Sequence, residues 1–161
     1  MIATILFNKN ESGKGHSMTY KIVTEEQDLQ KVFEIRKEIF VKEQEVAEEE
    51  EFDEFDSLDA DCDHILVYYD NKPVGVGRIR AVEGVGKLER ICILKPYRKY
   101  GLGKTVVKSL EEIALEKGLT QAKLHGQSHA EGFYHKLGYE TASDEFMEDG
   151  IPHYLMIKQF N

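Results

Sequence analysis

The sequence predicts a mixed α/β (α+β) fold in which one central sheet is flanked by helices. The first observation behind this prediction is that short runs rich in β-branched residues alternate with amphipathic segments of helical period. The second is length, because 161 residues suffice for one domain with a sizeable core. The third is that no internal repeat or low-complexity linker divides the chain, apart from one acidic run.

The first half of the chain predicts a strand, a helix and a hairpin. Residues 19–23 (TYKIV) have strand composition, and residues 25–44 carry apolar side chains at close to helical spacing. Two strand-like runs, HILVYYD at 64–70 and PVGVGRIR at 73–80, flank the turn NK and predict a hairpin. Glycines 75 and 77 in the second run indicate a bulge or a close backbone approach, or else are simple turn-edge glycines.

The second half predicts a strand–turn–helix unit followed by a strand, a short helix and a strand. GKLERICIL at 86–94 has strand composition, and TVVKSLEEIALEKG at 105–118 is an amphipathic helix that ends at Gly118. QAKLHGQ at 121–127, AEGFYHKLG at 130–138 and PHYLMIKQF at 152–160 supply the last three elements.

The turn between the third strand and the second helix, RKYGLGKT at 98–105, predicts an anion site. It ends like an ATP-binding P-loop, but that motif requires glycine where the chain has Arg98. A dinucleotide-binding fingerprint fails as well, since it requires glycine at Val106. What remains is a turn with two glycines and a helix start, with four Lys/Arg and no acid between residues 95 and 104, which favours a phosphate. The alternative is an ordinary solvated loop.

Charge is distributed unevenly along the chain. The net charge is −9, yet residues 43–63 hold twelve Asp/Glu and no Lys/Arg, which leaves 21 basic against 18 acidic residues elsewhere. Such a run is typical of a solvated surface, and the alternative is a rim that attracts cationic substrates. The acidic balance argues against a nucleic-acid partner.

Two cysteines without a C-x-x-C spacing and no apolar stretch of about 20 residues predict a cytoplasmic protein without a membrane partner. Residues 1–17 lack the features of a signal peptide and are expected to be an N-terminal extension, either a leader or an added segment. Residues 18–161 are expected to form a single domain.

Several motifs, in this order, give the chain a family resemblance. Arg98-x-x-Gly101-x-Gly103 resembles the pyrophosphate loop of the GNAT superfamily of acyl-CoA-dependent N-acyltransferases, and AEGFYHKLGY at 130–139 resembles that family's A-x-x-F-Y-x-x-x-G-Y/F element. RKEIFVKEQ at 36–44 and EDGIPHYLM at 148–156 are similar to the ElaA-like branch. The resemblance covers about residues 18–160 and implies a mostly antiparallel central sheet.

The resemblance also implies a function and a cosubstrate. The expected enzyme is an N-acetyltransferase that transfers an acetyl group directly from acetyl-CoA to a primary amine of a small molecule or peptide, without a metal. A homodimer is compatible with the resemblance. A non-catalytic acyl-CoA-binding or regulatory module is the alternative function.

The site residues are carried over from the same motifs. Tyr134 matches the family's general acid, and its alternative role is that of a core aromatic. The backbone N–H of Ile93 is the expected oxyanion donor. The cofactor-binding residues are Ile91, Cys92 and Ile93 for the pantetheine arm, and Arg98, Lys99, Gly101, Leu102, Gly103 and Lys104 for the diphosphate.

The general base is less constrained by the sequence. Glu89 lies on the same strand face as Ile91 and Ile93 if the strand alternates regularly, so it is expected to face the cleft and activate the amine through water. Its alternative role is that of an exposed partner of a neighbouring basic residue. Imidazoles can also serve as bases, and the candidates are His125, His129 and His153.

Overall fold

The computed structural model describes residues 2–6 and 16–160 and confirms the fold class. Nine described strands form one sheet with the order β1-β2-β3-β4-β5-β6-β9-β7, and β8 pairs with β9. Every neighbouring pair is antiparallel except β5 and β6. The strands are β1 (Ile2–Leu6), β2 (Ser17–Ile22), β3 (Asp63–Tyr69), β4 (Lys72–Val82), β5 (Val85–Ile93), β6 (Gln121–Gln127), β7 (Glu140–Thr141), β8 (Phe146–Glu148) and β9 (Ile151–Gln159).

The helices follow the predicted order, with one change of type. The segment expected as a single helix over 25–44 begins as an α-helix and continues as a π-helix, in which the N–H of Gln44 bonds the carbonyl of Ile39. The helical segments are α1 (Glu26–Arg36), η1 (Lys37–Glu43), α2 (Glu48–Glu51), η2 (Lys95–Tyr100), α3 (Leu102–Glu116), η3 (Ser128–Ala130) and α4 (Glu131–Lys136).

The β3–β4 hairpin turns one residue earlier than the sequence predicts. Asp70 and Asn71, not Asn71 and Lys72, occupy the turn, with φ values of 46° and 68°. Positive φ at both central positions fits the right-handed twist of a hairpin, and Asp and Asn tolerate it better than Lys. The hairpin itself is confirmed.

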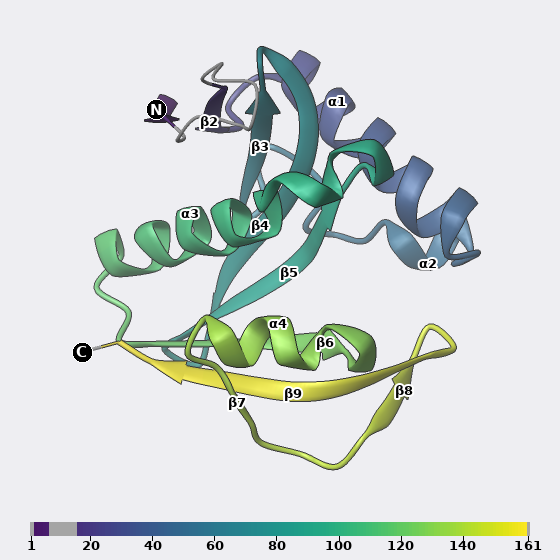
Figure 1. Ribbon diagram of the computed structural model, residues 1–161, viewed down its shortest axis with the longest axis vertical. Helices are drawn as coiled ribbons and strands as arrows, with labels where there is room; N and C mark the ends of the chain where they lie inside the picture. The colour runs from purple at the N-terminus through teal and green to yellow at the C-terminus, as the bar shows by residue number, and fades with distance from the viewer. Residues whose placement is uncertain (1, 7–15, 161) are drawn as a thin grey trace.

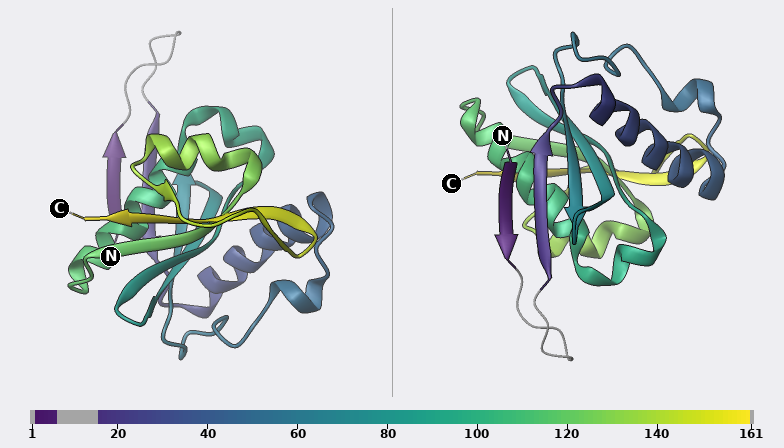
Figure 2. Two further views of the ribbon diagram at one scale, coloured as in Figure 1. Left: turned by 90° about the horizontal axis from the view of Figure 1, so that it is seen from below. Right: turned by 90° about the horizontal axis from the view of Figure 1, so that it is seen from above.

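Helices cover the two faces of the sheet and create two cores. One core packs α1 against the sheet through residues such as Leu29, Val32 and Val76. The larger core packs α3 against the other face and includes Val106 and Leu110. Figure 2 shows α1 and α2 on one side of the sheet and α4 on the other. Both faces of the sheet therefore carry helices.

Strands β5 and β6 separate after three paired residues. Their parallel ladder runs from Gly86–Ala122 to Leu88–Leu124 and then stops. A bulge begins at the same level: Gly77 of β4 faces both Arg90 and Ile91, and Arg90 adopts a φ of 58°. Bulges bend a strand and increase its twist, so β5 turns away from β6. Figure 1 shows the resulting V, which opens towards α2 and β8.

Gly77, one of the two glycines predicted to mark a bulge or a close backbone approach, does both. A Cβ on Gly77 would lie 2.8 Å from Cγ1 of Val106 and 2.9 Å from Cδ1 of Leu110, so only glycine lets α3 lie this close to the bulged strand.

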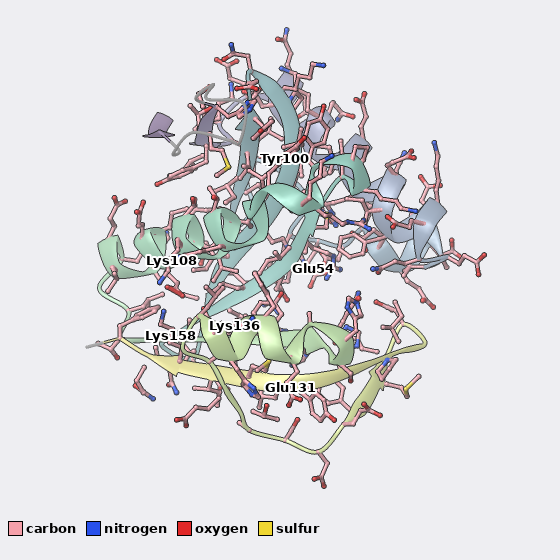
Figure 3. The ribbon with its side chains drawn as sticks, in the orientation of Figure 1. Glu54, Tyr100, Lys108, Glu131, Lys136 and Lys158 are labelled. Carbon is pink, nitrogen blue, oxygen red and sulfur yellow. The ribbon has the colours of Figure 1, made fainter. Side chains whose placement is uncertain are left out.

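The closed end of the V is held by polar contacts of α3 with β9 and with Tyr139, which directly precedes β7. The Glu111 carboxylate accepts hydrogen bonds from the Tyr139 hydroxyl at 3.0 Å and from Lys158 Nζ at 2.9 Å. Figure 3 shows Lys108 on α3 and Lys158 on β9, the two lysines nearest this carboxylate. Glu111 and Tyr139 are buried, so their contact fixes α3 over the parallel ladder.

Candidate active site

A cleft of about 280 Å³ lies between the separated strands. One wall is β5 from Leu88 to Ile93, and the other is formed by β6, α4 and the β8–β9 hairpin. The side chain of Tyr134 reaches it from α4, and η1 contributes Phe40. The cleft thus joins segments from both halves of the sequence.

The wall made by β5 presents backbone groups that no neighbouring strand of the described sheet pairs, although the carbonyl of Ile93 accepts a hydrogen bond from the Arg98 side chain. Cys92 pairs with Val76 of β4, and the N–H of Leu94 donates to the carbonyl of Val74 at 2.9 Å. Because successive residues of a strand direct their N–H and C=O groups to opposite sides, Ile91 and Ile93 direct theirs to the side that β6 has left. An extended, amide-containing ligand can bond to such an edge as an added strand.

The N-terminus of α3 lies at the end of the same wall. Gly101 has a φ of 73°, no side chain caps the helix, and its first turn contains no acid. A 15-residue helix with free N–H groups at its start attracts an anion. Leu102 is fully buried, so it can offer only its backbone, whereas Lys99 and Lys104 are exposed. These observations fit a diphosphate.

Arg98 makes a hydrogen bond and an ion pair that the sequence did not predict. Its Nε donates to the carbonyl of Ile93 at 2.9 Å, and its two terminal nitrogens lie 2.6 Å from the two carboxylate oxygens of Glu43. The guanidinium thus connects the loop to η1 rather than pointing freely at the helix N-terminus. The Arg98 hydrogen bond holds the pKa of Glu43 below its usual value.

Tyr134 lines the cleft from α4. Its ring packs on β6, where a Cβ on Gly126 would be only 3.0 Å from Cδ2 and Cε2 of the ring, and it also contacts Phe133 and Tyr139 edge-on. Burial, followed by the nearby Cys92 thiol, raises the pKa of Tyr134 to about 12. Among the described residues the hydroxyl has no hydrogen-bond partner, so a neutral phenol faces the cleft with its proton available.

Glu89 lines the cleft, but not for the reason the sequence suggested. Leu88 and Ile91 both belong to the larger core, three positions apart, so the bulge at Arg90 reverses the alternation and puts Glu89 on the opposite face from Ile91. Its carboxylate bonds Arg78 at 3.2 Å and Arg80 at 2.8 Å. Although burial opposes it, these partners and Lys87 lower the pKa of Glu89 to about 2.

The acidic run at residues 43–63 is not a uniformly solvated surface. Arginines from other parts of the chain pair with several of its carboxylates. Glu51 is buried and the Asp56 side chain is 4% exposed, and Asp53 joins them in a network of ion pairs with the arginines at 36, 78 and 90. Arg36 and Arg78 are 0% and 1% exposed. Cations distant in sequence thus neutralise the central acids of the run, which the local composition could not reveal.

A second cluster of titratable groups lies on the β6 wall. The Nδ1 of His125 is 2.9 Å from Glu148 Oε1, and the Nε2 of His153 is 3.7 Å from Oε2 of the same carboxylate. Glu148 lies in the EDGIPHYLM segment, but no local pattern there predicts a role for it. His129 is exposed and bonds Gln127 at 2.7 Å.

Two absences hold for the described part of the chain. Within residues 2–6 and 16–160, no three His, Cys, Asp or Glu side chains are grouped so as to hold a metal ion. None of the helices described is both long and apolar enough to cross a membrane.

Comparison with known proteins places this architecture in a family. The Acetyltransferase (GNAT) domain family matches residues 22–160. The Bacillus subtilis protein YyaT, itself uncharacterized, is 61% identical over 144 residues, covering 89% of this chain and 97% of YyaT. Escherichia coli ElaA superposes with a TM-score of 0.76 at 23% identity, covering 87% of this chain and 98% of ElaA. PaiA N-acetyltransferase from Thermoplasma acidophilum, solved in complex with coenzyme A, superposes with a TM-score of 0.68 at 18% identity, covering 88% and 99%. The chain belongs to the GNAT acetyltransferase family.

Proposed function

We propose that this acyltransferase is an N-acetyltransferase that uses acetyl-CoA and acts on a primary amine of a small molecule or peptide. The observation that carries the proposal is the alignment of an unpaired β5 edge with the uncapped N-terminus of α3. An edge of amides suits the pantetheine arm, and a helix start flanked by Lys99 and Lys104 suits the diphosphate. A ligand that needs both, in that order, is a coenzyme A thioester.

The chemistry follows from two groups that line the cleft. The N–H of Ile93 is suited to stabilise the oxyanion that forms when an amine attacks the thioester carbonyl. Collapse of that intermediate expels a thiolate, which needs a proton. Tyr134 is suited to supply it, because its pKa of about 12 keeps the phenol protonated at neutral pH.

A thiol-release assay tests the proposal. The purified protein is incubated with acetyl-CoA and a panel of alkylamines, polyamines, aminoglycosides and lysine-containing peptides, and free coenzyme A is measured. We expect release that depends on both acetyl-CoA and at least one amine, with the acetylated amine detected by mass spectrometry. Coenzyme A binding without turnover for any amine would instead support the alternative, a non-catalytic acyl-CoA-binding module.

The acceptor and the assembly follow less directly. Glu49 and Glu50 of the acidic run are exposed on α2, towards which the separated strands open (Figure 1), and this favours a cationic acceptor, whereas the central acids are neutralised. A homodimer and a cytoplasmic location remain predictions, and sedimentation of the purified protein tests the first of them.

A further inference from the structure

The proposed function leaves open which group removes the proton from the acceptor ammonium. Alkylamines are protonated at neutral pH and cannot attack a thioester until they lose that proton. The inference below concerns this step and therefore rests on the proposed function.

His125 and Glu148 form a dyad with a defined hydrogen-bond direction. The hydrogen bond from His125 keeps the pKa of Glu148 below its usual value, so the carboxylate is ionised and can only accept. The Nδ1 of His125, 2.9 Å away, must therefore donate. In the neutral ring the lone pair then lies on Nε2, which has no hydrogen-bond partner among the described residues.

The dyad is fixed in place by its surroundings. The Phe146 ring meets His125 edge-on at 5.1 Å and stacks on His153 at 6.1 Å. The Nδ1 of His153 donates to the carbonyl of Ile151 at 2.6 Å, which directs its Nε2 towards Glu148. The carboxylate therefore lies between two imidazoles and is suited to stabilise positive charge on His125.

His125 and Tyr134 lie on opposite faces of β6. Alternate residues of β6 face opposite sides, and Gly126 contacts the Tyr134 ring, so His125 and Gln127 point to the other face. Gln127 pairs with His153 of β9, and directly opposite residues of a sheet point to the same face. His125, Gln127 and His153 therefore lie on one face. An acceptor entering from this face would meet His125 before the thioester, and the departing thiol would meet Tyr134.

We propose that His125 is the catalytic base of the amine transfer and that Glu148 is its positioning residue. Nε2 takes one proton from the ammonium, and the imidazolium later releases it to solvent. The freed nitrogen lone pair forms the new C–N bond, the C–S bond breaks, and the thiolate takes the proton of Tyr134. The second proton lost by the nitrogen restores Tyr134 through water, so the transfer releases one proton in all.

Glu89 is less suited to this role. Its pKa of about 2 and its contacts with Arg78 and Arg80 make it a weak proton acceptor. The charged and titratable groups on the elements around His125 include Glu148 on β8 with the adjacent Asp149, His153 on β9, His129 on η3, Lys123 on β6, Lys87, Glu89 and Arg90 on β5, and Glu51 on α2.

The test compares acceptors of different basicity. His125→Gln should lower kcat/KM for an alkylamine by about 10²-fold, within the range of general base catalysis. Hydroxylamine is already neutral near pH 7.5, so the same variant should lose at least tenfold less with it. The acidic limb of the alkylamine pH profile should change in His125→Gln, and added imidazole should restore part of the rate in His125→Ala. The matched control is His135→Gln, an exposed histidine on α4 outside the cleft.

Glu148→Gln should lower kcat/KM for the alkylamine about tenfold, whereas Glu145→Gln, on the loop before β8, should not. The tautomer provides a readout independent of turnover. Imidazole ¹⁵N spectra should show His125 protonated at Nδ1 in the neutral ring, and Glu148→Ala should shift the ring towards the Nε2–H form.

The outcomes separate the two proposals. An active parent protein whose His125→Gln variant loses less than fivefold, or loses equally with both amines, overturns the base and leaves the proposed function standing. A neutral Nε2–H tautomer in the parent protein also overturns the base. Absence of turnover with every amine overturns the proposed function, and the base with it.

Discussion

Replacing Arg78 with leucine should destabilise the protein strongly, because this one side chain serves three carboxylates. Arg78 is 1% exposed, and its guanidinium bonds Asp53 at 2.7 Å, Asp56 at 2.9 Å and Glu89 at 3.2 Å. Leucine fills much of the space of the aliphatic stem but leaves these acids without their shared cation. The perturbation is therefore an uncompensated buried charge and not mainly a cavity.

The magnitude follows from the pKa values that Arg78 helps to lower. The pKa of Asp53 falls from 3.8 to about 2, and that of Glu89 from 4.5 to about 2, although burial alone would raise both. One pKa unit corresponds to about 1.4 kcal/mol, so the net stabilisation of the two carboxylates, after the opposing cost of burial, is about 2–3 and about 3–4 kcal/mol. Arg80 and Arg90 also stabilise these carboxylates and remain in the variant. We therefore expect Arg78→Leu to lower the free energy of unfolding by about 3–5 kcal/mol.

The stability difference between the parent protein and Arg78→Leu should depend on pH. Carboxylates with lowered folded-state pKa values stabilise the fold above their unfolded values of about 4, and this stabilisation is lost as pH falls towards 2. In Arg78→Leu the same groups can be protonated at higher pH, which removes the buried-charge penalty. The stability difference between parent and variant should therefore be largest at pH 7 and shrink towards pH 4.

Urea unfolding at pH 7, 5.5 and 4, followed by circular dichroism, measures this difference. The matched control is Arg80→Leu, because Arg80 bonds only Glu89 of these acids and its side chain is 22% exposed, so about 1 kcal/mol is expected. A loss below about 1 kcal/mol for Arg78→Leu at pH 7, or a difference that does not change with pH, would refute the reasoning.

Three further predictions concern the cleft. Tyr134→Phe should lower turnover about 10²-fold or more while leaving acetyl-CoA affinity nearly unchanged by calorimetry; a loss below fivefold would assign the residue to packing. Gly126→Ala should mimic that loss, because its Cβ would lie 3.0 Å from the Tyr134 ring and displace it, and unchanged turnover would contradict the position of the ring. Gly103→Asp should abolish acetyl-CoA binding by placing an anion at the helix start; Gly103→Ala, 3.1 Å from Phe133, controls for crowding, and equal affinity in the Asp variant and the parent would exclude this site.

Periodicity was sufficient for the elements that bury one continuous face. The α3 helix and strands β3, β4, β5, β6 and β9 were predicted because their apolar residues recur with the period of the element. Strands β7 and β8 have two and three residues, too few to show a period. The first strand, β1, lies within the segment expected to be an extension, and its pairing with β2 depends on contacts outside the local pattern.

The site was predictable where a motif fixes the backbone and not where side chains meet across the fold. The glycine turn before α3 and the position of Tyr134 on α4 could be located from local sequence. The direction of Glu89 could not, because a positive φ at the non-glycine Arg90 leaves no sequence signal. Contacts between residues far apart in sequence, such as Glu43 with Arg98, are set by tertiary packing.

Because β5 and β6 separate early, the sheet has an incomplete hydrogen-bond ladder between these two strands. In the described sheet only three residue pairs form the ladder between β5 and β6, and beyond them no neighbouring strand supplies hydrogen bonds to the β5 edge. A ligand that completes this ladder would join the two halves of the sheet as well as occupy the cleft, so binding and unfolding should be thermodynamically linked. At a ligand concentration of about 100 times Kd, mass action adds about 2.7 kcal/mol to the free energy of unfolding. Amide exchange at Ile91 and Ile93 should slow most, since those two N–H groups would change from an open edge into the interior of a continuous sheet.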